Sequence, residues 1–397
     1  MSHLEDLKRR ALAQVDARRD ELIRIADTIH ANPEVAFEEH QSAALLCRVL
    51  EENGFTVARG VANLETAFVA GLPNRGRPTV AFLAEYDALP GLGHACGHNL
   101  IGTSAVGAAL AVKAVLAELP GAVQVIGTPA EEGGGGKVIM VDAGVFEGVD
   151  AALIVHPSSK NKTRGSSLTS YKIRVEFFGK PAHAAAKPDE GINALDAIIL
   201  TFNGINALRQ HLRDDARIHG IITHGGDAPN IVPEYAAARF YVRAVDVPYT
   251  EEMIQKVRGC AEGAALMTGA RLEFEEYAPH YENMLSNPVL AHLFEANMAA
   301  LGIALSPPED KERMGSTDMG NVTQVVPGLH PSIVIGPEEM GGHTAEFCEA
   351  AGSPAGHEGM IQAAKLMAMT AVDLLAQPDN LVAVRQAFEE QKRQQGG

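Results

Sequence analysis

Short apolar strands alternate with helical stretches over roughly the first 160 residues, and this alternation restricts the possible folds more than any other feature. Residues 79–85 (Thr-Val-Ala-Phe-Leu-Ala-Glu) are apolar enough for a central strand, and residues 101–119 have the alanine-rich composition of a helix. The other elements expected in this region are strands at residues 65–71, 123–129 and 151–156 and a helix at residues 136–144. Such alternation predicts an α/β/α domain around a central, mostly parallel sheet.

Two helices are expected before the first strand. Apolar residues recur at helical spacing through residues 4–30, and they do so again through residues 42–54, where Asn53 and Gly54 end the pattern. With 397 residues, the chain is longer than one hydrophobic core usually supports. We therefore expect two domains.

The second domain is expected as an insertion, because the pattern changes at about residue 167. The elements expected after this point are a strand at 169–179, a helix at 191–211, strands at 218–224 and 236–245, a helix at 251–267 and a strand at 271–277. This order is typical of a ferredoxin-like α+β module. The prediction is a first domain formed by residues 1–167 and 280–397, with an inserted domain at residues 168–279.

Charge and cysteine content exclude several classes of protein. The chain carries 33 basic and 50 acidic residues, a formal net charge of −17, and it has no basic stripe suited to nucleic acid. Its four cysteines lie far apart without a CxxC pair, which favours a reducing, cytoplasmic compartment. The N-terminus lacks the apolar segment of a signal peptide, and no run of about 18 apolar residues indicates a membrane span. No nucleic-acid or membrane partner is expected.

Polar residues gather where the predicted strands end. Glu85 and Asp87 follow one strand, Glu131 and Glu132 follow the next, and His156 closes a third. In parallel α/β sheets, ligands bind beyond the carboxyl ends of the strands. These side chains are therefore expected to meet at one edge of the sheet.

The segment from Pro90 to Asn99 (Pro-Gly-Leu-Gly-His-Ala-Cys-Gly-His-Asn) is poorly suited to packing and lies just before a helix. Its glycines let the backbone approach a ligand closely. Cys96 and His98 are then candidates for a thiolate and an imidazole on adjacent metal ions. A second interpretation makes Cys96 a nucleophile with His98 as its base. Taken alone, an isolated cysteine is usually a small buried hydrophobe.

Glu131 and Glu132 end an apolar strand and precede four glycines. A pair of glutamates on a solvated loop would carry no function. In this position, however, one carboxylate can bind a metal ion while its neighbour accepts a proton from water as a general base.

Four motifs together resemble the M20 metallopeptidase family, in its aminoacylase and amidohydrolase branch. They lie in the family's order at residues 84–99, 129–137, 155–157 and 179–185. Within this branch, residues 85–99 and Gly-Ser-Thr-Asp-Met-Gly-Asn-Val at 315–322 most resemble the Xaa-Arg dipeptidase and aminobenzoyl-glutamate hydrolase group. Asn99 also favours that group, because auxin-conjugate hydrolases usually carry aspartate there.

The resemblance implies a site with two divalent ions, Zn²⁺, Mn²⁺ or Co²⁺. The implied metal ligands are Cys96, His98, Glu132, His156 and His343. It makes Glu131 the general base, and it makes Asp87 the carboxylate that orients a ligand histidine. Glu85 stands where relatives often have aspartate, and neither Glu85 nor His94 receives a role.

The resemblance also implies roles for the inserted domain. His183 would reach a metal site, often that of the partner subunit, and stabilise charge on the carbonyl oxygen of the scissile amide. Asn230 and Arg243 would contact the terminal carboxylate of the substrate, for which an arginine fork is suited. As ordinary residues, His183 would be a loop histidine and Arg243 a surface ion-pair partner. The domain itself would act as a lid and form a homodimer.

The expected reaction is hydrolysis of the amide bond of a dipeptide or an N-acyl amino acid, which releases a free amino acid. Water would be activated by the two metals and by Glu131. Two alternatives remain open, a cysteine-nucleophile amidase that uses Cys96 and His98, and a noncatalytic M20-like binding protein. The sequence does not distinguish basic dipeptides, aminobenzoyl-glutamate and other N-acyl amino acids as substrates.

Overall fold

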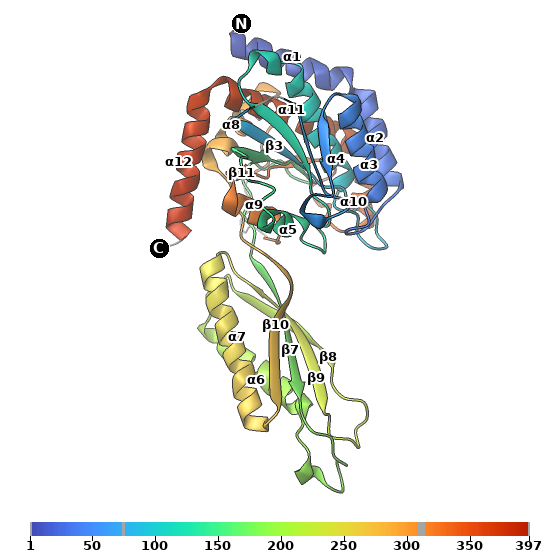
Figure 1. Cartoon of the computed structure of the whole chain (residues 1–397), viewed down its shortest axis with the longest axis vertical. Helices are drawn as coiled ribbons and strands as arrows, with labels where there is room; N and C mark the ends of the chain where they lie inside the picture. Colours follow the sequence, from blue (N-terminus) through green and yellow to red (C-terminus); the bar gives the residue numbers. More distant parts are fainter. Residues whose placement is uncertain (1, 74–75, 308–313, 396–397) are drawn as a thin grey trace. The chain divides into compact units, whose positions relative to one another are not determined.

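The computed structural model describes residues 2–73, 76–307 and 314–395. The chain divides into two compact units, which are coloured along the sequence in Figure 1. The larger unit comprises residues 1–166, 284–313 and 317–397, and the smaller unit comprises residues 167–283 and 314–316. The sequence did not predict that residues 314–316 group with the smaller unit.

A six-stranded sheet in the order β1-β2-β4-β3-β5-β11 forms the centre of the larger unit. Its strands are β1 (Thr56–Arg59), β2 (Phe68–Gly71), β3 (Thr79–Ala84), β4 (Ala122–Gly127), β5 (Ala151–Leu153) and β11 (Gly328–Leu329). Strands β4, β3, β5 and β11 pair in parallel, whereas β2 pairs antiparallel with both of its neighbours. The predicted mixed α/β fold with a mostly parallel central sheet is confirmed.

Helices cover both faces of this sheet, as Figure 1 shows. Side chains alternate along the fully buried β3, so that Val80 and Phe82 join one hydrophobic cluster while Ala81 and Leu83 join another. The first cluster contains residues of α1 (His3–Ala17), α2 (Arg19–Ala31), α3 (His40–Glu52), α4 (His98–Lys113), α8 (Pro288–Ala300) and α11 (Pro354–Ala376). The second contains residues of α5 (Gly136–Asp142) and α9 (Met319–Val325).

The single helix expected over residues 4–30 is wrong, because the chain forms α1 and α2 with a break at Arg18. The backbone there is non-helical, with φ −103° and ψ 6°. The Arg18 guanidinium donates to Asn53 Oδ1 at 2.7 Å and to Glu21 at 2.9 Å. These bonds attach the break to the end of α3, so the apolar periodicity continues across two helices.

Helix α11 is long and apolar enough to cross a membrane by length and composition alone. However, 83% of its most apolar window is buried inside the protein, as expected of a core helix. The remaining elements of the larger unit are the parallel pair β6 (His156–Ser158) and β12 (Ser332–Val334), with α10 (Ala345–Ala351) and α12 (Pro378–Gln395). The strand expected at residues 151–156 is therefore two strands in two different sheets.

The smaller unit has a four-stranded antiparallel sheet in the order β10-β7-β9-β8. Its elements are β7 (Ser170–Phe178), α6 (Ala194–Leu208), β8 (Arg217–His224), β9 (Tyr235–Arg243), α7 (Val247–Thr268) and β10 (Arg271–Tyr281). This is the ferredoxin-like order that was expected from the sequence. Helix α7 starts four residues before the expected position because Asp246 caps it by accepting from the Tyr249 N–H at 2.8 Å.

Candidate metal centre

The loop between β3 and α4 brings Cys96 and His98 to the edge of the sheet. Gly97 has a positive φ of 76°, and a Cβ atom at this position would lie 2.8 Å from Pro157 Cγ. A residue with a side chain would therefore clash and be strained there. Because the loop turns so tightly, α4 begins at His98, three residues before the expected start.

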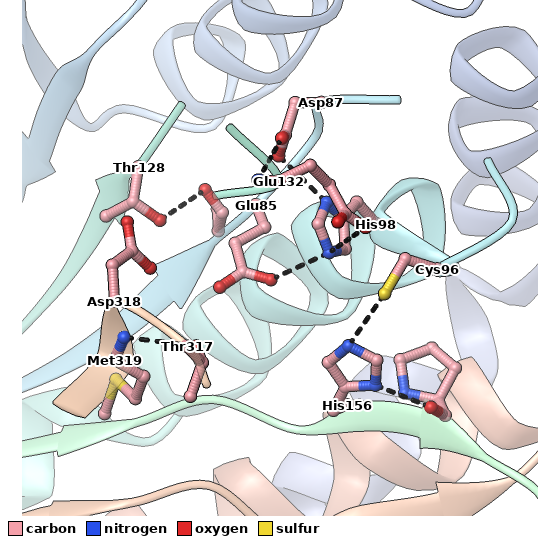
Figure 2. Close-up of polar contacts among 12 residues, drawn as sticks. Glu85, Asp87, Cys96, His98, Thr128, Glu132, His156, Thr317, Asp318 and Met319 are labelled. Atoms are coloured by element: carbon pink, nitrogen blue, oxygen red, sulfur yellow. Dashed lines mark hydrogen bonds and ion pairs between the residues drawn. The ribbon is translucent and has the colours of Figure 1, made fainter. Parts of the chain in front are cut away.

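Asp87 connects two of the expected metal ligands. Its Oδ1 lies 2.8 Å from His98 Nδ1, and its Oδ2 accepts the backbone N–H of Glu132 at 2.9 Å. Asp87 and His98 are both buried. Figure 2 shows that this arrangement leaves the other ring nitrogen of His98, Nε2, on the side of the imidazole away from Asp87.

The loop after β4 is shaped by its glycines. A Cβ atom on Gly136 would lie 1.9 Å from the Pro129 carbonyl oxygen, and one on Gly134 would lie 2.3 Å from the Phe37 ring. Ala130 has a positive φ of 60°, and its N–H donates to Glu39 Oε1 at 2.9 Å. The four-glycine run therefore folds the chain back sharply just after Glu131 and Glu132.

Two histidines from other elements approach this region. His156 begins β6, and its Nε2 lies 3.4 Å from Cys96 Sγ. His343 has a positive φ of 60°, and its backbone N–H donates to Ala95 O at 3.0 Å. Its Nε2 lies 3.3 Å from Glu132 Oε1.

These side chains form three overlapping groups of potential metal ligands, with the donor atoms of each group within 4.8 Å of one another. The groups are Cys96, His98 and His156; Cys96, Glu132 and His343; and His98, Glu131 and Glu132. Among residues 2–73, 76–307 and 314–395, no hydrogen-bond partner is found for His98 Nε2 or Glu132 Oε1; both atoms are buried, which is costly for a polar atom. Thiolate, imidazole and carboxylate groups are suitable ligands of divalent metal ions, and a bound ion would give these buried polar atoms a partner.

The electrostatic environment favours ligand roles over a cysteine nucleophile. Burial raises the pKa of the Cys96 thiol, so the reactive thiolate is disfavoured unless a cation stabilises it. Burial, and then the charges of Glu85 and Asp318, raise the pKa of Glu131 well above its ordinary value. Burial opposes a charged His98, but Asp87, Cys96 and Glu85 raise its pKa well above the usual range.

The model of peptidase family M20/M25/M40 matches residues 81–366, which include every residue of the three ligand groups. The chain belongs to this family. A Mus musculus Xaa-Arg dipeptidase is 39% identical over 403 residues, which cover 98% of this chain and 93% of the relative. One of the subunits of p-aminobenzoyl-glutamate hydrolase from Escherichia coli is 34% identical over 437 residues, with coverage of 91% and 90%.

Solved M20 structures share the fold. The Bacillus subtilis YxeP protein, a dinuclear metal-binding peptidase of the M20 family, superposes with a TM-score of 0.68 at 23% identity. The match covers 91% of this chain and 99% of that protein. Together with the ligand groups, these relatives identify the chain as a metal-dependent amide hydrolase of the M20 family.

The M20 site also contains buried residues to which sequence reasoning gave no role. Lys137, the first residue after the glycine run, lies 2.6 Å from both Glu85 Oε1 and Asp318 Oδ1. A lysine that follows four glycines was a weak signal, and Asp318 served only as a clue to subgroup. Glu39 was missed entirely, because nothing in the first helices indicates a contact to Ala130.

His94 and Asn99, which flank the two ligands of the α4 loop, have local partners. His94 Nε2 lies 3.1 Å from Ile29 O, and Asn99 donates to Ala351 O at 3.1 Å. Both side chains are buried. These contacts fix the α4 loop against the surrounding helices.

The three candidate residues of the inserted domain lie in the smaller unit. His183 and Asn230 are exposed, and the Ala184 N–H donates to Asn230 O at 3.0 Å, so their loops lie side by side. Arg243, at the end of β9, donates to Ser316 Oγ at 3.2 Å. Its Nε is buried without a hydrogen bond among the described residues, and this leaves a donor available to a ligand.

Proposed function

We propose that this M20 hydrolase cleaves the amide bond of a dipeptide or an N-acyl amino acid and releases a free amino acid. The convergence of Glu131 with the five metal-ligand candidates at one sheet edge carries this proposal. The relatives named above include an Xaa-Arg dipeptidase and an aminobenzoyl-glutamate hydrolase, and both names describe amide substrates that end in an amino acid. The substrate class follows theirs.

Two divalent cations, Zn²⁺, Mn²⁺ or Co²⁺, are proposed to bind at the overlapping groups. Their ligands would be Cys96, His98, Glu132, His156 and His343. Bound there, the cations would supply Lewis acidity and lower the pKa of water. The contact of Asp87 with His98 Nδ1 supports an orienting role for Asp87, because ligand histidines commonly donate their second ring N–H to a carboxylate.

Glu131 is proposed as the general base. Its carboxylate accepts a proton from the attacking water and later gives it to the nitrogen of the leaving amine, so that one group serves both steps. The raised pKa of Glu131, caused by burial and by nearby negative charge, suits a carboxyl group that must hold the proton between these steps.

The smaller unit is proposed to bind the rest of the substrate. Arg243 offers its unmet Nε donor to the terminal carboxylate, and Asn230 adds an amide contact. The His183 imidazole would donate to the carbonyl oxygen of the scissile bond as negative charge develops there. Closure of this unit over the substrate would exclude water from the reaction.

A homodimer through the smaller unit is also proposed. Strand β8 is an edge of its sheet, and it exposes Ile221 and Ile222 by 66% and 44%. Edge strands of this kind readily pair with another chain. Ile221→Lys should lower the molar mass measured by light scattering from dimer to monomer.

The four cysteines are free, which supports the proposal of a cytoplasmic location.

The test of the function is a metal-removal experiment. Protein stripped with a chelator is assayed against basic dipeptides, aminobenzoyl-glutamate and N-acyl amino acids, and then again after addition of Mn²⁺, Zn²⁺ or Co²⁺. We expect activity to disappear on stripping and to return with metal. Activity that survives complete removal of metal, or that is abolished by alkylation in metal-free protein, would instead indicate the cysteine-nucleophile amidase. Metal binding without turnover of any substrate would favour the binding protein.

A further inference from the structure

Glu85, Lys137 and Asp318 form a buried ion cluster that the proposed reaction does not use. Lys137 Nζ lies 2.6 Å from a carboxylate oxygen of each acidic residue, and the Lys137 backbone N–H donates to Asp318 Oδ2 at 3.0 Å. All three residues are at most 1% exposed. One ammonium group thus faces two carboxylates, so the cluster carries an excess negative charge.

An excess charge inside a protein is costly unless an opposite charge lies beside it. Lys137 holds Glu85 through Oε1, and the second oxygen, Oε2, lies 3.3 Å from His98 Nε2. Figure 2 shows the Glu85 carboxylate directed toward this ring nitrogen. The unbalanced side of the cluster therefore faces a metal-ligand candidate.

The contact between Glu85 and His98 does not have the geometry of a hydrogen bond. Within the part of the chain that the structure describes, neither His98 Nε2 nor Glu85 Oε2 makes a hydrogen bond, although both atoms are buried. His98 already uses Nδ1 in its contact with Asp87. When Nδ1 gives its hydrogen to Asp87, a neutral His98 presents Nε2 as an acceptor, and two facing acceptor atoms need a cation, either a proton on His98 or a metal ion, near both of them.

The distance fits two ligands of one ion. Two donor atoms that each lie about 2.1 Å from an ion, at a tetrahedral angle, are about 3.4 Å apart. The separation of 3.3 Å between Glu85 Oε2 and His98 Nε2 agrees with this, as does the separation of 3.3 Å between Glu132 Oε1 and His343 Nε2. Glu85 belongs to none of the three ligand groups above, and His98 is its link to the metal centre.

We propose that Glu85 is an additional ligand of the ion that His98 binds, and that Lys137 and Asp318 are positioning residues that hold its carboxylate in place. This inference rests on the proposed metal centre. The extra carboxylate increases the negative charge around the ion and adds an oxygen donor. It therefore raises the affinity for divalent cations, and it favours Mn²⁺ relative to Zn²⁺ because manganese prefers oxygen ligands.

The experiment compares metal binding by the full-length wild-type protein and by Glu85→Gln. Stripped protein is equilibrated with Mn²⁺ or Zn²⁺, the metal content per chain is measured by mass spectrometry, and affinities are obtained by chelator competition. The amide keeps the shape of the side chain but loses its charge. Each metal should bind at two sites, and only the affinity of the site that contains His98 should fall. We expect this loss to be about 10- to 100-fold, and larger for Mn²⁺ than for Zn²⁺.

A matched control is available in the same unit. Asp373 is 4% exposed, and its Oδ1 lies 2.6 Å from Lys8 Nζ. Like Glu85, it is a buried carboxylate that forms an ion pair with a lysine, but it belongs to none of the ligand groups found among the described residues. Asp373→Asn should bind both ions with wild-type affinity. The visible spectrum of the Co²⁺-loaded protein should change in Glu85→Gln and stay unchanged in Asp373→Asn.

Thermal unfolding separates a ligand from a residue that only supports the fold. Glu85→Gln removes a buried ion pair with Lys137, so the metal-free variant should unfold below the wild-type temperature. The increase in Tm on adding Mn²⁺ should then be smaller than in the wild type. An equal decrease in Tm with and without metal would overturn the proposal.

The outcomes also separate this inference from the proposed function. If the wild-type protein binds two ions and Glu85→Gln binds both with unchanged affinity and an unchanged Co²⁺ spectrum, the assignment of Glu85 is wrong while the metal centre stands. If the wild-type protein itself binds fewer than two ions per chain, the proposed two-metal function fails, and this inference fails with it.

Discussion

Asp87 Oδ1 lies 2.8 Å from His98 Nδ1, and the other oxygen of the same carboxylate accepts the Glu132 N–H. One buried side chain therefore orients an imidazole from α4 and the backbone of the loop after β4. Asp87→Asn should weaken metal binding about 10- to 100-fold, because the amide cannot accept both hydrogen bonds. Chelator competition measures this loss, and an unchanged affinity would show that Asp87 does not support the ligands.

Replacement of Glu131 tests the assignment of the general base. Glu131→Gln keeps the size of the side chain but cannot accept a proton, so we expect kcat to fall by about 10²- to 10⁴-fold. Metal content should stay close to that of the wild type, because the substitution leaves all five proposed ligands in place. Turnover at the parent rate would mean that another group takes the proton.

Arg243 is expected to act on substrate binding rather than on chemistry. Its half-buried guanidinium has an unmet Nε donor, and lysine cannot form the two parallel bonds of an arginine fork. Arg243→Lys should raise KM about 10-fold or more for substrates with a terminal carboxylate, with a smaller change in kcat. Arg239 is exposed on the same strand, and Arg239→Lys is the control. Equal KM values for both variants would exclude the proposed contact.

The glycine run offers a test of the loop geometry. A Cβ atom on Gly136 would overlap the Pro129 carbonyl oxygen at 1.9 Å, whereas no atom of the described residues lies within 4 Å of a Cβ atom on Gly133. Gly136→Ala should reduce the free energy of unfolding by about 1–3 kcal/mol, the usual cost of forcing atoms into a packed site. Gly133→Ala should change it by less than about 0.5 kcal/mol. Denaturant titration of the metal-free proteins compares the two, and similar losses would contradict the close approach.

The sequence was most informative where local pattern and chemistry coincide. Alternating strands and helices predicted the sheet, and soft donors at strand ends predicted that Cys96, His98 and His156 would meet. Helix limits were less predictable, because the Arg18 break depends on a bond to the distant Asn53. The same limit applies to the ion pair between Lys137 and Asp318, which joins helices 181 residues apart in the chain. No local periodicity encodes such contacts.

Glu39 provides a prediction of pH dependence, since its buried carboxylate accepts the Ala130 N–H beside the proposed base. Burial, with a further contribution from Asp87, raises the pKa of Glu39 from 4.5 to about 7. A carboxyl whose pKa is raised on folding contributes stability that is complete below pH 4.5 and is lost as the pH rises through 7.

Glu39→Gln cannot ionise, and its amide can still accept from Ala130 and donate to Thr66 Oγ1, the present partner of the second oxygen. Between pH 5 and pH 8, the stability of this variant relative to the wild type should therefore increase by about 2 kcal/mol. Denaturant unfolding of the metal-free proteins measures the change, with Glu38→Gln, which removes an exposed carboxylate from the same loop, as control. A constant difference across this range would mean that Glu39 is already ionised in the folded protein at pH 5.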